Sequence, residues 1–103
     1  MSDTHSLLDA KQNLLAICRE VASTRQRAYV REKGGDRFMT IAPTSHHALG
    51  PIIDVKAVDF RHNFSRFTGL VRLGFSFRLL QRDDASVAYV RRHTAYDDPL
   101  KNI

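Results

Sequence analysis

Apolar positions change their period along the first half of the chain, and each change predicts an element. From Leu7 to Val21 they recur at spacings of three, four or seven residues, which places them on one face of an α-helix. Ser6 precedes this run with Asp9 three residues later, a combination typical of a helix start. We therefore predict a helix from about Leu7 to Ser23. RAYVRE and RFMTIA, separated by the turn signal KGGD, predict a β-hairpin after it. The apolar face consists of Leu7, Leu14, Ile17, Cys18 and Val21.

The second half repeats this order. Phe60, Phe64, Phe67 and Val71 follow the same helical spacing, and Gly74 is expected to close that helix. FSFRLLQ and VAYVRR, with DDAS between them, predict a second hairpin. A short segment before each helix, DTHS and PIIDVK, is expected to form an edge strand. The predicted fold class is α+β, built from two strand–helix–hairpin units.

A small motif returns at the same offset. Asp9, Lys11 and Asn13 are matched by Asp59, Arg61 and Asn63, fifty positions later. We interpret residues 1–43 as a first repeat, 44–51 as a linker, 52–93 as a second and divergent repeat, and 94–103 as a short tail. A unit of this size buries only a thin core alone, so we expect the repeats to share one core around an approximate two-fold axis.

Composition narrows the class of protein. With 43% hydrophobic residues the chain is too apolar to be disordered. The single cysteine, Cys18, cannot form an internal disulfide, and its apolar neighbours favour a buried, inert thiol. No apolar run is long enough for a signal peptide or a membrane span, so we expect a cytoplasmic protein without membrane contact.

Charge gives the strongest indication of a partner. Sixteen Lys and Arg against eleven Asp and Glu give a net charge of +5. From Phe60 to Arg82 there are five arginines and no acidic residue. Basic surfaces of this kind attract phosphate polymers or acidic proteins, although a merely solvated face has the same composition.

Enzyme chemistry is poorly represented. His46 and His47 stand together without a third metal ligand at a recognisable spacing. The pairs Asp83-Asp84 and Asp97-Asp98 fall in a predicted turn and in the tail, where solvated carboxylates are common. We expect no catalytic activity, no metal and no cofactor.

The segments SLLDAKQNLLAICREV and AYVREKGGDRFMTIAP resemble the amino-terminal domain of the Phd/YefM (prevent-host-death) type II antitoxins. The resemblance covers roughly residues 4–43, and VDFRHNF with its following hairpin resembles the family more weakly. It implies a domain that dimerises and binds palindromic operator DNA as a transcriptional autorepressor. A basic residue of the helix motif and an arginine of the hairpin contact the DNA in that family.

Matched position by position, the resemblance assigns DNA contacts to Lys11 and Arg31 in the first repeat and to Arg61 in the second. The second hairpin contact falls on Gln81 by simple offset, with the cation Arg82 beside it, and both assignments remain open. Independently of the family, Lys11 and Arg61 fall near the predicted helix starts, where backbone N–H groups favour a phosphate. Lys33 beside the Gly-Gly turn is a further candidate. Asn13 and Asn63 suit either a structural hydrogen bond, which we favour, or an adenine edge.

The chain departs from the family after the first repeat. Family members carry a long segment there that wraps a toxin, whereas this chain carries the second repeat. The expected partner is therefore double-stranded DNA. A cognate toxin and a homodimer of these internally duplicated chains are further partners that the family implies. The alternative function is a protein-interaction module that neutralises a toxin or another partner without binding DNA.

Overall fold

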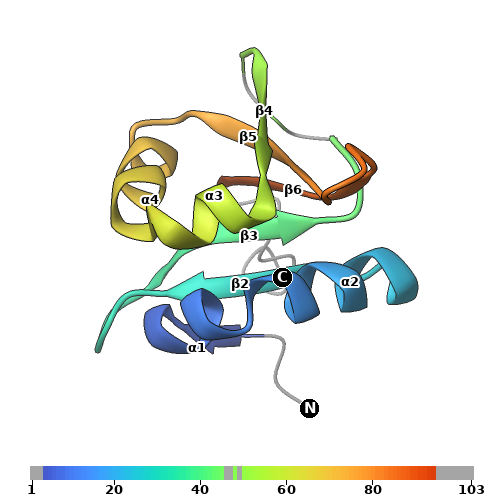
Figure 1. The fold of residues 1–103 in the computed structure, drawn as a ribbon. Helices are drawn as coiled ribbons and strands as arrows, with labels where there is room; N and C mark the ends of the chain where they lie inside the picture. Colours follow the sequence, from blue (N-terminus) through green and yellow to red (C-terminus); the bar gives the residue numbers. More distant parts are fainter. Residues whose placement is uncertain (1–3, 46–47, 49, 95–103) are drawn as a thin grey trace.

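The computed structural model describes residues 4–45, 48 and 50–94, and over these residues the chain has a mixed α+β fold (Figure 1). His46, His47, Asp97, Asp98 and all of the predicted tail except Thr94 lie outside the described residues. The described elements are β1 (Thr4–Ser6), α1 (Leu7–Gln12), α2 (Leu14–Thr24), β2 (Ala28–Arg31), β3 (Arg37–Ala42), β4 (Ile52–Lys56), α3 (Ala57–His62), α4 (Phe64–Arg72), β5 (Ser76–Leu80) and β6 (Ser86–Arg92).

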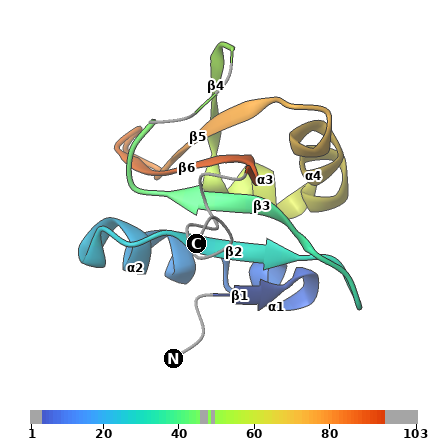
Figure 2. The ribbon, with the colours of Figure 1, turned by 180° about the vertical axis from the view of Figure 1, so that it is seen from behind.

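The strands form one sheet in the order β1-β2-β3-β6-β5-β4. Both predicted edge strands are present, and each runs parallel to its neighbour, whereas the other pairings are antiparallel. The helices α1 to α4 lie on one side of this sheet, as Figures 1 and 2 show from opposite directions. Over the described residues, no helix combines the length and apolar character needed to cross a membrane.

Each predicted helix is broken once, so the continuous helix expected from Leu7 to Ser23 is a wrong prediction. Asn13 lies between α1 and α2 with a φ of −118°, and Asn63 lies between α3 and α4 with a φ of −115°. These angles are far from the helical value of about −63°. The backbone hydrogen bonds still bridge the break, since the Asn13 N–H donates to the Asp9 carbonyl and the Ile17 N–H to the Asn13 carbonyl. The chain therefore bends at each asparagine without losing these bonds.

The predicted helix ends and turns are confirmed. The Asp9 N–H donates to the Ser6 hydroxyl oxygen at 3.1 Å, which makes Ser6 the cap of α1. Gly74 follows α4 with a φ of +107°, a conformation that favours glycine. The first hairpin turns at Gly34 (φ +66°) and the second at Asp84 (φ +65°).

The apolar faces of both halves meet in one core, as expected. Leu14, Ile17, Cys18 and Val21 of α2 belong to the same buried cluster as Phe64 and Val71 of α4, with sheet residues such as Met39, Ile41 and Val90 beneath them. Phe67 packs against this cluster but is only partly buried. Neither half therefore has a core of its own.

Cys18 is buried without measurable exposure. Burial in this apolar environment raises the pKa of its thiol to about 12, because the core disfavours the charged thiolate. The thiol is thus protonated at neutral pH, as expected for a structural cysteine.

Strand pairing relates positions in the two halves. Thr4 of β1 pairs with Tyr29, and Asp54 of β4 pairs with Arg78. Asp54 follows Thr4 by fifty residues, whereas Arg78 follows Tyr29 by forty-nine. The second half is therefore one residue shorter between its edge strand and its hairpin. At the centre of the sheet Ile41 pairs with Val90, which is again forty-nine residues later.

Candidate nucleic-acid interface

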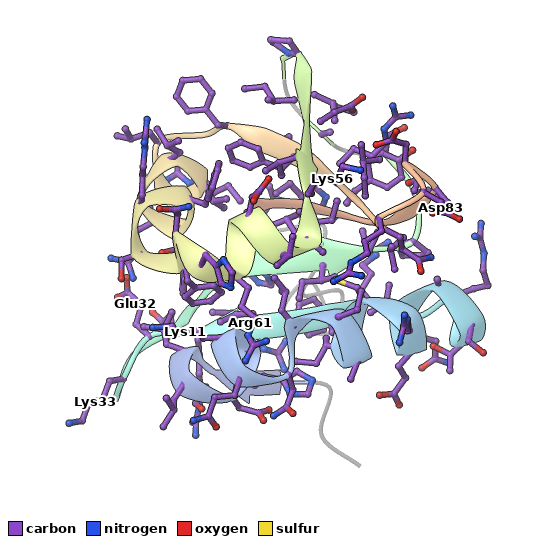
Figure 3. All side chains as sticks on the ribbon, in the orientation of Figure 1. Lys11, Glu32, Lys33, Lys56, Arg61 and Asp83 are labelled. Carbon is purple, nitrogen blue, oxygen red and sulfur yellow. The ribbon has the colours of Figure 1, made fainter. Side chains whose placement is uncertain are left out.

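Lys11 and Arg61 occupy equivalent places in the two halves. Each lies in the last turn of its short helix, α1 or α3, and each side chain is exposed. The helix α1 begins at Leu7 and α3 at Ala57, so each cation lies about one turn after a helix start, as expected. Both helices then end at the asparagine breaks. Figure 3 shows both side chains on the helix side of the molecule, Arg61 near the middle of the view and Lys11 to its left. Neither forms a hydrogen bond or ion pair with a described residue.

Hydrogen bonds on either side of the cation account for the repeated spacing of the small motif. In the first half the Asn13 side-chain amide donates to Asp9 Oδ1 at 2.7 Å, and His5 Nδ1 lies 2.6 Å from Asp9 Oδ2. These bonds, first that with His5 and then that with Asn13, lower the pKa of the Asp9 carboxyl. In the second half the Asn63 amide donates to the Asp59 carbonyl oxygen at 3.3 Å. Both asparagines bond within their own helix, which supports the structural role.

A groove runs between α2 and α3 on the helix side. It has a volume of about 360 Å³ and is lined by four basic side chains and by apolar ones that include the buried Leu14 and Leu80. The four basic residues are Arg19, Lys56, Arg61 and Arg82. Two sequence candidates, Arg61 and Arg82, are therefore brought together, with two cations that sequence reasoning had not singled out.

A second groove, between α1 and α4, contains Lys11. Its volume of about 390 Å³ is close to that of the α2–α3 groove, but its basic residues are only Lys11 and Arg72. Leu8 on its rim is 64% exposed, and Val58 in the α2–α3 groove is 49% exposed. Lys11 and Arg61 thus lie in separate grooves rather than in one cluster.

Two cations of the acid-free run are paired with acids from elsewhere in the chain. Arg72 Nη2 lies 3.0 Å from Glu32 Oε1, and its guanidinium stacks over the Phe38 ring at 4.4 Å. Arg78 donates two hydrogen bonds to Asp54, at 2.9 and 2.6 Å, and these bonds raise the pKa of its guanidinium. These two arginines therefore contribute less to a basic surface than the sequence suggested.

The α2–α3 groove keeps most of its positive charge. Lys56 Nζ lies 2.6 Å from Asp84 Oδ1 and donates to the Arg82 carbonyl oxygen at 2.9 Å, so it is held at the groove wall. The side chains of Arg19, Arg61 and Arg82 are exposed, and none has a hydrogen-bond or ion-pair partner among the described residues. Three unpaired cations therefore face solvent around one groove.

The two candidates of the first hairpin, Arg31 and Lys33, line neither groove. Arg31 ends β2 and is exposed, and Lys33 is exposed at the tip of the β2–β3 hairpin, where Figure 3 shows it far from Arg61. Strand register shows which positions correspond in the two hairpins, where the sequence left Gln81 and Arg82 open. Arg31 pairs with Arg37, and the equivalent pair is Leu80 with Ser86. The counterpart of Arg31 is thus the buried Leu80 and neither Gln81 nor Arg82, while Arg82 matches Lys33.

Arg19 and Lys56 were missed for identifiable reasons. Arg19 stands beside Cys18 in an apolar segment, and only its position on the helical wheel indicates that it is exposed. Lys56 ends β4, and nothing in PIIDVK indicates that it meets Asp84 of the distant hairpin. Within the residues that the structure describes, no three or more His, Cys, Asp or Glu side chains come together as metal ligands would.

Comparisons with protein-family models, with curated proteins and with solved structures find no match for this chain. The Phd/YefM resemblance is therefore carried by the motifs alone.

Proposed function

We propose that the two halves are tandem copies of a Phd/YefM-like unit, so that one chain corresponds to a family dimer. The support is the repeated order of strand, helix pair and hairpin, with equivalent strand pairings in the two halves. An internal two-fold axis would cross the sheet at the pair Ile41–Val90. With an offset of forty-nine residues, Tyr89 is the equivalent of Thr40 and Arg91 is the equivalent of Ala42. The two flanking pairs, Thr40–Arg91 and Ala42–Tyr89, would therefore exchange under this axis. On this proposal no second chain is needed to form a complete binding unit.

The function we propose is sequence-specific binding of duplex DNA, in the manner of an autorepressing antitoxin that acts on its own operator in the cytoplasm. One observation carries it: the equivalent cations Lys11 and Arg61 are exposed and unpaired on the same side of the sheet, at the position that contacts DNA in the family. Unpaired cations on one face are what binding to a phosphate backbone requires. The protein acts as a binding protein in this proposal, without catalysis or cofactor.

The test is an electrophoretic shift with the DNA upstream of the protein's own gene. We expect a complex with this duplex at lower protein concentration than with a scrambled duplex of equal length, by a factor of about 10³ or more, as is typical of specific recognition. Because each half of the chain is proposed to contact one half-site, the protein should protect two half-sites about one helical turn apart, roughly 10 base pairs. Equal affinity for both duplexes would contradict sequence-specific regulation.

A second function, neutralisation of a protein partner such as a toxin, is favoured by a different observation. Leu8 and Val58, at equivalent positions in the two halves, are both exposed apolar side chains beside the grooves. Exposed apolar residues next to basic ones suit an amphipathic acidic segment of a protein. This function predicts a tight complex with a co-encoded protein and no shift of the upstream DNA.

A further inference from the structure

The two grooves contain equivalent positions but different side chains. Leu8 and Lys11 of the α1–α4 groove correspond, fifty residues on, to Val58 and Arg61 of the α2–α3 groove. Likewise Phe64 corresponds to Leu14. The grooves therefore have similar floors, similar volumes and one matched cation each. Any difference in what they bind comes from their other residues.

The decisive difference is at one position of the longer helices. Arg19 of α2 lines the α2–α3 groove, and its counterpart fifty residues later in the α1–α4 groove is Gly69 of α4. A second difference is that Arg72 of the α1–α4 groove is paired with Glu32 at 3.0 Å. The hairpin position equivalent to Glu32 is the neutral Gln81, which lines the α2–α3 groove. The α2–α3 groove thus gains a cation where the other has none. Its nearby acid, Asp84, pairs with Lys56 rather than with one of the three arginines.

We infer that the α2–α3 groove is the principal phosphate-binding site of the protein, and that Arg19 contacts the DNA backbone there together with Arg61 and Arg82. This inference rests on the proposed function and adds to it. Lys11 is the single unpaired cation among the described residues that line the α1–α4 groove, so that groove makes fewer phosphate contacts. The two halves of the protein therefore hold the two half-sites of the DNA unequally, although the family pattern implies a symmetric operator.

Counterion release makes this inequality measurable. Each phosphate that a cation neutralises contributes about −0.9 to the slope of log affinity against log salt. The loss of Arg19 or Arg61 should each flatten the slope by about 0.9. A cation placed at Gly69, the counterpart of Arg19, should steepen the slope by about 0.9, because it adds a phosphate contact that the α1–α4 groove lacks.

The experiment measures this slope on a mixed-sequence 20-base-pair duplex for the full chain and its variants. The loss variants are Arg19→Ala and Arg61→Ala, with Arg66→Ala as their control, an exposed arginine of α4 that lines neither groove. The gain variant is Gly69→Arg, with Ala22→Arg on the exposed side of α2 as its control. Gly69 tolerates a side chain, because nothing lies within 4 Å of a Cβ placed there. Thermal melting confirms that each variant is folded.

We expect a flatter slope for Arg19→Ala and Arg61→Ala, a steeper slope for Gly69→Arg, and unchanged slopes for both controls. If Arg19→Ala behaves like Arg66→Ala while Arg61→Ala flattens the slope, DNA binding stands and the inference about this groove is overturned. The inference is also overturned if Gly69→Arg steepens the slope no more than Ala22→Arg does. If the parent protein shows no salt-dependent binding at all, the proposed function fails first.

Discussion

Replacing Phe60 with alanine is expected to lower the free energy of unfolding by about 3–5 kcal/mol, since it opens a large cavity in a small core. Phe60 has no exposed surface, and its ring centroid lies 5.0 Å from that of Phe67, 5.8 Å from that of Phe77 and 6.0 Å from that of Phe64. A protein of this size has a total stability of about 5–15 kcal/mol, so the loss is a large fraction of it. Urea denaturation followed by circular dichroism measures the change.

The matched control is Phe75→Ala. Phe75 precedes β5 and is 43% exposed, so its removal leaves the core intact. We expect a change of about 0.5 kcal/mol or less, as for most surface substitutions. If Phe60→Ala were as mild as this control, the aromatic cluster would not hold the second half onto the sheet.

Reversing the charge of both equivalent cations, in the double variant Lys11→Glu with Arg61→Glu, is expected to abolish most DNA binding. At 0.1 M salt each lost phosphate contact costs a factor of about eight in affinity, from the release of roughly 0.9 counterion. Two lost contacts therefore weaken binding by about 60-fold, and the repulsion of the new carboxylates adds to this. Both side chains are exposed and unpaired among the described residues, so the fold should be unaffected.

The control for this variant is Arg66→Glu, which introduces a negative charge on α4 outside both grooves. Fluorescence anisotropy of a labelled upstream duplex compares the two proteins. A double variant that bound DNA as tightly as the control would place the DNA-binding surface elsewhere on the molecule.

The order and type of the elements could be predicted from sequence because they depend on local patterns. Each of these patterns acts within a few residues of the chain. They are the spacing of the apolar residues, the helix cap at Ser6, the helix end at Gly74 and the two turn sequences. The helix breaks could not be predicted in the same way, since asparagine is tolerated inside helices at a small cost. Each asparagine at a break donates its side-chain amide to the aspartate four residues earlier, and the motif contains both residues without indicating a bend.

The candidate site was less predictable, because its charges are set by contacts between distant parts of the chain. The run from Phe60 to Arg82 has no acid of its own, yet Glu32 pairs with Arg72 and Asp54 with Arg78. The second half is also one residue shorter between its helices and its hairpin, and no motif in the sequence marks this difference. A constant offset of fifty residues therefore matches the second hairpin to the wrong positions of the first. Lys11 and Arg61 stayed correct as equivalents because the motif itself aligns them.

The most direct test of DNA binding is a titration of the upstream duplex with the parent protein at 50 mM and 200 mM salt. Lys11, Arg19, Arg61 and Arg82 are the unpaired cations that line the two grooves, within the part of the chain that the structure describes. If each neutralises one phosphate, the log–log slope of affinity against salt is about −3.6. Affinity should then fall by roughly 150-fold between the two salt concentrations. No complex at 50 mM salt, or an affinity that does not change with salt, would contradict the account.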